Sequence, residues 1–146
     1  MIRPISHSEI LDAKGLLAEY AAECSIPEIG ETNPQREMYA HMESTGFMRC
    51  FGAFEGDDLV GFASILIYVL PHYGKTVASV ESLFVQKSHR HGGSGVKLMQ
   101  TIEKEAKEKG CTVVLYSAPT DSKLDSVLTE RRGYRRTNAV YTRKLQ

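Results

Sequence analysis

The fold is decided by residues 85–99, which read VQKSHRHGGSGVKLM. An apolar strand ends at Val85, a turn rich in glycine and cations follows, and the apolar spacing of Val96 and Met99 marks the start of a helix. Three glycines fall within four residues of this turn, so its backbone can adopt conformations that other residues rarely reach. The stretch therefore predicts a strand, a tight turn and a helix in direct succession.

Such a turn has the properties of an anion site. The first N–H groups of a helix lack partners and carry the positive end of the helix dipole. Glycines let the backbone approach a ligand, and Ser94 adds a hydroxyl donor, so we expect a phosphate or pyrophosphate to bind here. The alternative is that the glycines serve only the turn. The pattern GxxxxGK[ST] is absent, and GxGxxG fails at Leu98, so neither a nucleoside triphosphate nor a dinucleotide is favoured.

The helix after the turn is strongly periodic. Its apolar residues recur at helical spacing up to Gly110, which is well placed as the C-terminal cap. Glu103/Lys107 and Glu105/Lys109 are spaced one turn apart on its polar face, where opposite charges stabilise a helix. Beyond it we expect a buried strand at 112–116, a helix capped by Thr120 or Asp121 and ended by Gly133, and strands at 134–138 and 139–145.

Two helices and four strands are predicted before the helix that follows the turn. Ser6 and Glu9 have capping-box spacing, and apolar residues follow at helical intervals, which predicts a helix to about residue 24. The step Asn33-Pro34 predicts the start of a second helix, which ends near residue 46. The strands are expected at 2–5, 49–54, 59–70 and 76–85, with turns at EGDD and PHYG. The complete order is βααβββαβαββ, a mixed α/β fold around one sheet.

The composition fits one globular domain. The 146 residues carry 18 Lys+Arg and 18 Asp+Glu, and this neutral balance argues against a broadly basic nucleic-acid binder. Cys24, Cys50 and Cys111 are widely spaced and form no CxxC or Cys/His cluster, so we expect reduced thiols, no metal site and a cytoplasmic location. We expect no signal peptide and no membrane partner, because no apolar run approaches the roughly 20 residues of a membrane helix.

Residues 90–95, RHGGSG, match the motif [RQ]-x-x-G-x-[GA] and resemble the signature of the GNAT family of N-acetyltransferases. In that family the motif joins an apolar strand to a helix, as it does here. The step Gly133-Tyr134 is similar to the Gly-Phe that follows the family's fourth helix, and the order of elements resembles the family along essentially the whole chain. The resemblance implies a GNAT-like fold over residues 1–146, with a twisted, mostly antiparallel sheet of six or seven strands flanked by about four helices.

The resemblance also implies an acetyl-CoA site. In the family, N–H groups of the turn and helix start hold the pyrophosphate, and the end of the preceding strand binds the pantetheine arm. Acetyl-CoA is then the co-substrate, no metal is implied, and a backbone N–H at Leu83 would stabilise the oxyanion of acyl transfer. Carried over residue by residue, the cofactor-binding positions are Leu83, Phe84, Val85, Arg90, His91, Gly92, Gly93, Ser94, Gly95 and Ser122.

Glu81 is the first candidate for the general base. An amine that attacks a thioester must lose a proton, so a proton acceptor is needed directly or through water. Glu81 lies on the strand that ends at Val85, where many family members carry a carboxylate. The alternative is a solvent-facing strand residue or an ion-pair partner.

The chain departs from the family pattern in its last helix. Where the family often has a tyrosine that protonates the leaving thiolate, this chain has Thr129, and the frequent asparagine contact to CoA falls on Ser122. Tyr116 and Tyr141 are candidate substitutes for the acid, and both also fit as sheet or core aromatics. The departure is compatible with a thiolate that leaves without a positioned acid, and also with weakened or lost activity.

The expected function is acetyl transfer to a primary amine of a small molecule or peptide. The resemblance implies an acceptor site beside the two N-terminal helices, where Glu28, Glu31 and Glu37 could attract a cation or simply be solvated. One alternative is a GNAT module that binds acyl-CoA without turnover, as a sensor or scaffold. A less favoured alternative is a nucleic-acid-associated protein that uses the arginines at 131–132 and 135–136. A homodimer remains an open expectation.

Overall fold

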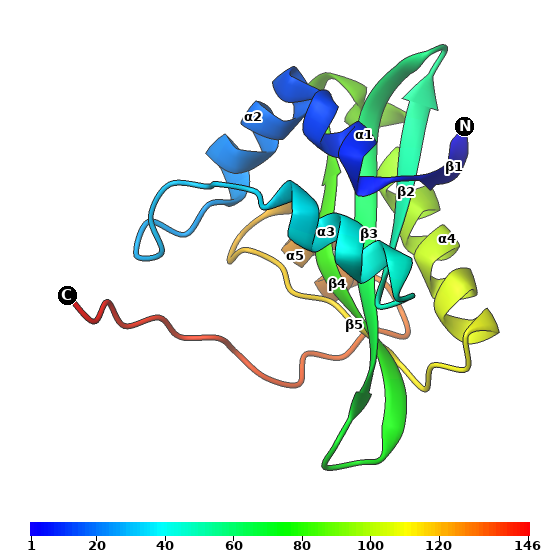
Figure 1. Cartoon of the computed structure of the whole chain (residues 1–146), viewed down its shortest axis with the longest axis vertical. Coiled ribbons are helices and arrows are strands. Elements are labelled where there is room, and N and C mark those ends of the chain that lie inside the picture. The colour runs from blue at the N-terminus through cyan, green and yellow to red at the C-terminus, as the bar shows by residue number, and fades with distance from the viewer.

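The computed structural model describes residues 1–146 and contains one five-stranded sheet in the order β1-β2-β3-β4-β5 (Figure 1). The first four strands pair antiparallel, and β5 pairs parallel with β4. The strands are β1 (Ile2–Ile5), β2 (Met48–Glu55), β3 (Asp58–Leu70), β4 (Lys75–Val85) and β5 (Val114–Leu115). The helices are α1 (His7–Asp12), α2 (Lys14–Cys24), α3 (Arg36–Ser44), the 3₁₀ segment η1 (Lys87–Gly92), α4 (Ser94–Glu108) and α5 (Lys123–Glu130).

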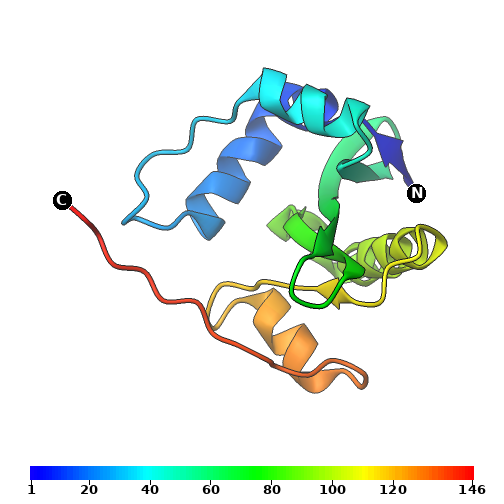
Figure 2. The same cartoon turned by 60° about the horizontal axis from the view of Figure 1, so that its bottom comes forward.

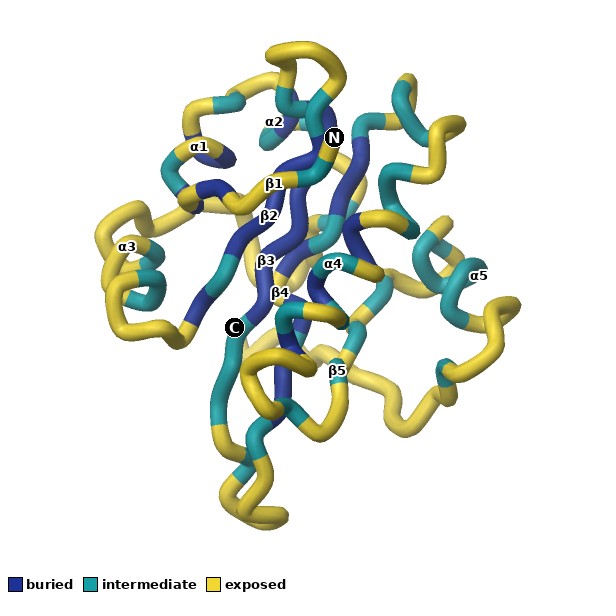
Figure 3. Tube along the Cα trace, turned by 90° about the vertical axis from the view of Figure 1, so that its right-hand side faces the viewer, coloured by how far each residue is buried: buried dark blue, intermediate teal, exposed yellow.

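The sheet separates two apolar layers. One layer lies between the sheet and α4, where Ile65 of β3 meets Leu98 and Ile102 of the helix. The other layer lies beneath α1 and α2, where Phe62 of β3 packs with Ile10. Figure 3 shows the buried residues concentrated along β2, β3 and β4, because these strands are covered on both faces. The expected mixed α/β class is confirmed.

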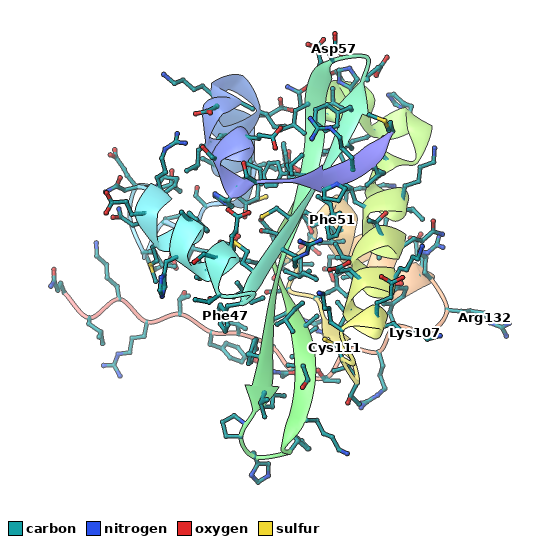
Figure 4. The ribbon with its side chains drawn as sticks, turned by 45° about the vertical axis from the view of Figure 1, so that its right-hand side comes forward. Phe47, Phe51, Asp57, Lys107, Cys111 and Arg132 are labelled. Atoms are coloured by element: carbon teal, nitrogen blue, oxygen red, sulfur yellow. The ribbon has the colours of Figure 1, made fainter.

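The two turns that separate β2, β3 and β4 were correctly predicted. Residues Gly56 and Asp57 connect β2 to β3, and Gly56 takes the positive φ of 59° that a tight hairpin needs. Asp57 lies at the tip of this hairpin in Figure 4. The predicted break at PHYG separates β3 from β4.

The N-terminal helices begin and end at different residues than expected. The single helix predicted to residue 24 is two helices, broken at Ala13, whose ψ of 69° turns the chain so that both α1 and α2 pack on the sheet. The next helix begins at Arg36 rather than at the step Asn33-Pro34. Its first turn is fixed by a long-range contact, since the Arg36 guanidinium pairs with Asp12 of α1 at 2.9 Å.

The two predicted C-terminal strands do not form, and the sheet has five strands rather than six or seven. Residues 134–146 form no helix or strand, and Figure 1 shows this end of the chain running away from the sheet. Val140, Tyr141 and Leu145 are 81%, 90% and 91% exposed. The strand expected at 112–116 is shorter and less buried, with only Val114–Leu115 paired to β4. A strand is stable only when it pairs with an edge, and the edge of a two-residue strand offers little pairing.

Candidate active site

The turn between β4 and α4 has the predicted strand, turn and helix. Gly93 precedes the helix in the left-handed conformation, with φ of 75° and ψ of 15°. The first helical hydrogen bond is donated by the Lys97 N–H to the Gly93 carbonyl at 3.0 Å. The N–H groups of Ser94, Gly95 and Val96 therefore precede the first helical bond and are available to a ligand.

The glycines of this turn face open space. A Cβ atom added at Gly92 or Gly93 would meet no atom within 4 Å, and one at Gly95 would meet only the Val85 side chain at 3.9 Å. By contrast, a Cβ at Gly61 of β3 would lie 2.9 Å from the Phe84 carbonyl oxygen, so packing requires that glycine. Gly92 has neither a crowded neighbour nor a positive φ. Its backbone is thus uncovered at the place where an anion could approach.

A cleft of about 170 Å³ opens beside this turn. Figure 2 shows α2 and α5 on opposite sides of the region, with η1 and the start of α4 between them. The cleft is lined by Glu23, Cys24, Leu83, Phe84, Val85, Arg90, Gly93, Gly95, Val96, Met99, Pro119, Ser122, Lys123, Leu124 and Val127. Of the predicted positions, His91, Gly92 and Ser94 do not line it.

The end of β4 presents an unpaired backbone edge to the cleft. β5 pairs with β4 only at Ala78 and Ser79, so the edge beyond them has no strand partner. The Gln86 N–H donates to Val60 of β3 at 2.8 Å, and strand alternation therefore turns the amides of Leu83 and Val85 toward the open edge. These are two of the backbone positions that the sequence predicted for the cofactor.

Arg90 is held by the protein rather than directed freely into the cleft. Its Nε donates to the Val85 carbonyl at 2.8 Å, and its guanidinium pairs with Glu23 of α2 at 2.9 Å. The neighbouring Glu19 accepts the Lys87 N–H at 2.9 Å. Two acidic residues one helical turn apart on α2 thus hold the turn in place. Glu23 was missed by the sequence analysis, and its spacing from Glu19 was the available signal.

Glu81 occupies a bulge in β4. Ser64 of β3 pairs with Ser82 and the next residue, Ile65, pairs with Val80, so Glu81 is the extra residue of its strand. Leu83 and Val85 pack in the α4 layer, so a regular strand counted back from them would direct Glu81 toward α4. The bulge instead turns the exposed Glu81 to the face covered by α1, α2 and α3. A hydrogen-bond contact with Tyr39 of α3 confirms this direction.

The charge of Glu81 affects the pKa of four groups around it. Burial and the charge of Glu81 raise the pKa of Tyr39 of α3, and they raise that of Tyr20 of α2 to about 12. Burial, followed by the nearby carboxylates of Glu43 and Glu81, raises the pKa of Cys50 of β2 to about 12. Burial lowers the pKa of His7 of α1, although Glu81 acts in the opposite direction. These groups are therefore neutral near pH 7.

Tyr116 lies outside the cleft, in a cluster against α4. Its hydroxyl and that of Tyr134 both donate to Glu103, at 2.5 and 2.7 Å. Burial and this carboxylate raise the pKa of Tyr116 far above its usual range, and that of Tyr134 to about 12. The predicted helical pairs Glu103/Lys107 and Glu105/Lys109 do not form. Glu103 accepts from the two tyrosines, and Glu105 pairs with Arg49 of β2 at 2.9 Å. The sequence could not foresee these partners from other elements.

The last helix contributes Ser122 to the cleft. Its hydroxyl accepts the Asp125 N–H at 3.1 Å and caps α5, so neither Thr120 nor Asp121 is the N-cap. Thr129 is exposed, and its hydroxyl donates to the Asp125 carbonyl at 2.8 Å. No tyrosine lines the cleft at the position where the family often has its acid.

The remaining charged residues lie at the surface. The arginines at 131–132 and 135–136 are exposed and make no ion pair, and Figure 4 shows Arg132 extending away from the body of the molecule. Glu28, Glu31 and Glu37 are exposed as well. No group of three or more His, Cys, Asp or Glu side chains is placed to hold a metal ion. None of the helices combines the length and apolarity needed to span a membrane.

Comparison with known proteins gives a consistent assignment. Residues 16–134 match the model of the Acetyltransferase (GNAT) family. A ribosomal-protein-alanine N-acetyltransferase from Brucella melitensis biovar Abortus 2308 is 20% identical, with a TM-score of 0.74 and 99% of each chain covered. An aminoglycoside acetyltransferase from an uncultured soil metagenomic sample is 18% identical, with a TM-score of 0.77 over 100% of this chain and 96% of its own. These two structures show the shared fold. No curated protein matches the sequence.

Proposed function

Because the chain belongs to the GNAT family of acetyltransferases, we propose that it is an acetyl-CoA-dependent N-acetyltransferase acting on a primary amine. The observation that carries the proposal is the construction of β4. Its backbone edge at Leu83 and Val85 has no strand partner and borders the cleft, while the bulge turns Glu81 to the face covered by α1, α2 and α3. One strand thus offers a site for a thioester along its edge and a proton acceptor on the adjoining face.

The cofactor side supplies binding groups that match CoA. The N–H groups at the start of α4 and the uncovered backbone of Gly92 and Gly93 would hold the pyrophosphate. The amide edge of β4 would bind the pantetheine arm, and the Leu83 N–H would stabilise the oxyanion that forms during attack. The fit needs no metal ion, because backbone N–H groups and a helix dipole can neutralise the phosphates.

The reaction we propose is direct transfer. The amine nitrogen forms a bond to the thioester carbonyl carbon, the amine proton passes to Glu81, and the carbon–sulfur bond then breaks to release the CoA thiolate. Cys24 is the only thiol that lines the cleft. Burial raises the pKa of Cys24, so it is a weak nucleophile at neutral pH and an acetyl-enzyme is disfavoured.

The proposed reaction uses no tyrosine as acid. Tyr116 is bonded to Glu103 outside the cleft, and Thr129 donates to a backbone carbonyl. A thiol is far more acidic than an alcohol, so the thiolate can leave and take a proton from water. The same observation favours the second candidate function, an acyl-CoA-binding module without turnover.

The acceptor is proposed to be an amine on a small molecule or a peptide. Among the similar structures, one is named for ribosomal-protein alanine and another for aminoglycosides, which represent both classes. The exposed Glu81 carboxylate lies on the face of α1, α2 and α3, where a cationic amine would meet a negative group.

Calorimetric titration with acetyl-CoA tests the cofactor site, with desulfo-CoA as the thiol-free control. We expect micromolar binding that falls at least a hundredfold in Gly93→Glu, because the new carboxylate would face the phosphates. Gly74→Glu is the matched control, since Gly74 also has a positive φ and open surroundings but lies at the β3–β4 turn. An acetylation assay against a panel of amines then separates the enzyme from the binding module. Absence of binding by the folded protein would contradict both.

A further inference from the structure

Tyr39 connects the proposed base to a buried part of the molecule. Its hydroxyl donates to Glu81 Oε1 at 3.1 Å, although the two residues are 42 positions apart. Its ring stacks on the ring of His7, with centroids 3.5 Å apart and an interplanar angle of 11°. His7 is only 4% exposed, so the stack fixes the phenol against a packed surface.

We infer that Tyr39 is a positioning residue that holds the Glu81 carboxylate, together with Ser64, in the orientation needed to receive the acceptor's proton. The catalytic role inferred for Tyr39 rests on the proposed function, whereas the contact between Tyr39 and Glu81 does not. Ser64 donates to Glu81 Oε2 at 2.9 Å, so each carboxylate oxygen has one fixed partner. The carboxylate is therefore restrained at both oxygens rather than free to rotate.

This arrangement leaves room for an acceptor. An ionised carboxylate has about four lone-pair sites, and Tyr39 and Ser64 occupy one on each oxygen. One site on each oxygen remains for an ammonium group or a bridging water. Ser64 is fully buried and its hydroxyl lies 2.5 Å from that of Ser82. The inner partner of Glu81 is thus immobile, and Tyr39 is the partner on the exposed side.

The backbone of α3 is itself tied to α1. Glu43 of α3 accepts the His7 N–H at 3.0 Å, and Arg36 of the same helix pairs with Asp12 of α1. The His7 Nδ1 atom has no hydrogen-bond partner, so its ring serves the stack by packing rather than by a polar contact. Two ties between α1 and α3 therefore hold Tyr39 at the distance that its hydroxyl needs.

The phenol remains a donor over the working range of pH. Burial and the Glu81 charge raise the pKa of Tyr39, so its hydroxyl stays protonated at neutral pH. The titratable groups that surround Glu81 from the other elements are His7 of α1, Tyr20 of α2 and Cys50 of β2. None of them is charged near pH 7, and Tyr39 alone among the tyrosines bonds to Glu81.

The experiment compares Tyr39→Phe with Tyr20→Phe. Tyr39→Phe keeps the ring on His7 and removes only the hydroxyl, whereas Tyr20 packs edge-on against Phe62 and does not bond to Glu81. The titration of the Glu81 side chain is followed by carbon-13 NMR, which needs no turnover. We expect its midpoint to rise by about one pH unit in Tyr39→Phe, because a donated hydrogen bond favours the ionised form. We expect no change in Tyr20→Phe.

Kinetics add a second readout if the protein acetylates an amine. We expect kcat to fall about tenfold in Tyr39→Phe. The acid limb of the pH–rate profile should move to higher pH, and KM for acetyl-CoA should not change. Replacement of Tyr39 by 3-fluorotyrosine preserves the shape and strengthens the donor, so the midpoint should move to lower pH even if the phenylalanine variant folds poorly. Identical Glu81 titrations in all folded variants would overturn the inference. If the protein binds acetyl-CoA but acetylates no amine, the proposed reaction is contradicted. The NMR titration would still decide whether Tyr39 bonds to Glu81.

Discussion

The two sides of β4 are built in different ways. The side proposed to bind the cofactor is formed mainly by a continuous stretch, from Leu83 to Val96, and offers backbone groups to a ligand. The side proposed for the acceptor is formed by single side chains from separate elements, such as Tyr39 of α3 and Ser64 of β3, which converge on Glu81. The difference teaches that one half of this site depends on local conformation, whereas the other half depends on tertiary packing.

Replacing Glu81 tests the acceptor side and should have the largest effect. In Glu81→Gln the proton acceptor is lost, so we expect turnover to fall by about 10²–10⁴ while acetyl-CoA affinity is retained. The loss should shrink as the pH approaches the acceptor's own pKa, because the amine then arrives without its extra proton. Steady-state rates across pH and calorimetry check both parts. Glu37→Gln is the charge-matched control on α3, and an equal loss there would remove the special role of Glu81.

The conformation of the proposed cofactor side could be predicted because its information is local. Gly93 has the positive φ expected of a glycine-rich turn, and the helix begins at the next residue. The hairpin at Gly56 was predicted for the same reason, since a two-residue turn is specified by its own residues. In each case the sequence signal and the structure lie within a few residues of one another.

The geometry of the proposed acceptor side could be predicted only in part. Glu81 was chosen as a candidate, but its orientation depends on a bulge against β3 that no local pattern reveals. Tyr39 and Ser64 were not found, because their contacts exist only after distant elements have packed. The break at Ala13 was missed for a related reason, since helical periodicity continues across it while packing bends the chain.

Two glycines test the difference between a residue required by packing and one that faces open space. The expected effects are smaller than that of Glu81→Gln. Gly61→Ala should lower the free energy of unfolding by about 1–3 kcal/mol, because the new Cβ would lie 2.9 Å from the Phe84 carbonyl oxygen. Gly92→Ala should leave it unchanged or raise it by up to about 1 kcal/mol, because its surroundings are open and its φ is not positive. Urea unfolding measures both changes. Acetyl-CoA affinity should weaken in Gly92→Ala, and a large loss of stability there would make that glycine structural.

The C-terminal segment is the case in which a local pattern did not lead to structure. Its alternating residues predict strands, yet residues 134–146 make no backbone hydrogen bond to the sheet. These residues need a partner strand in order to form a strand, just as the orientation of Glu81 depends on residues from other elements. The edge strand β5 offers only two paired residues. Strand propensity without an edge to pair with is therefore insufficient.

Truncation after residue 138 tests this interpretation and should have the smallest effect. The removed residues include Val140, Tyr141 and Leu145, which are at least 81% exposed, and their contact with the body is the hydrogen bond from Thr142 to Glu28 at 2.8 Å. We expect the free energy of unfolding to change by less than about 0.5 kcal/mol, because little apolar surface and no backbone pairing is lost. Urea unfolding of the truncated and full-length chains measures the change, and Thr142→Val isolates the single hydrogen bond. A loss above about 2 kcal/mol would mean that the segment pairs with the sheet. Local strand propensity would then have been sufficient to form structure here, and the distinction between local and tertiary information drawn for β4 would not extend to this end of the chain.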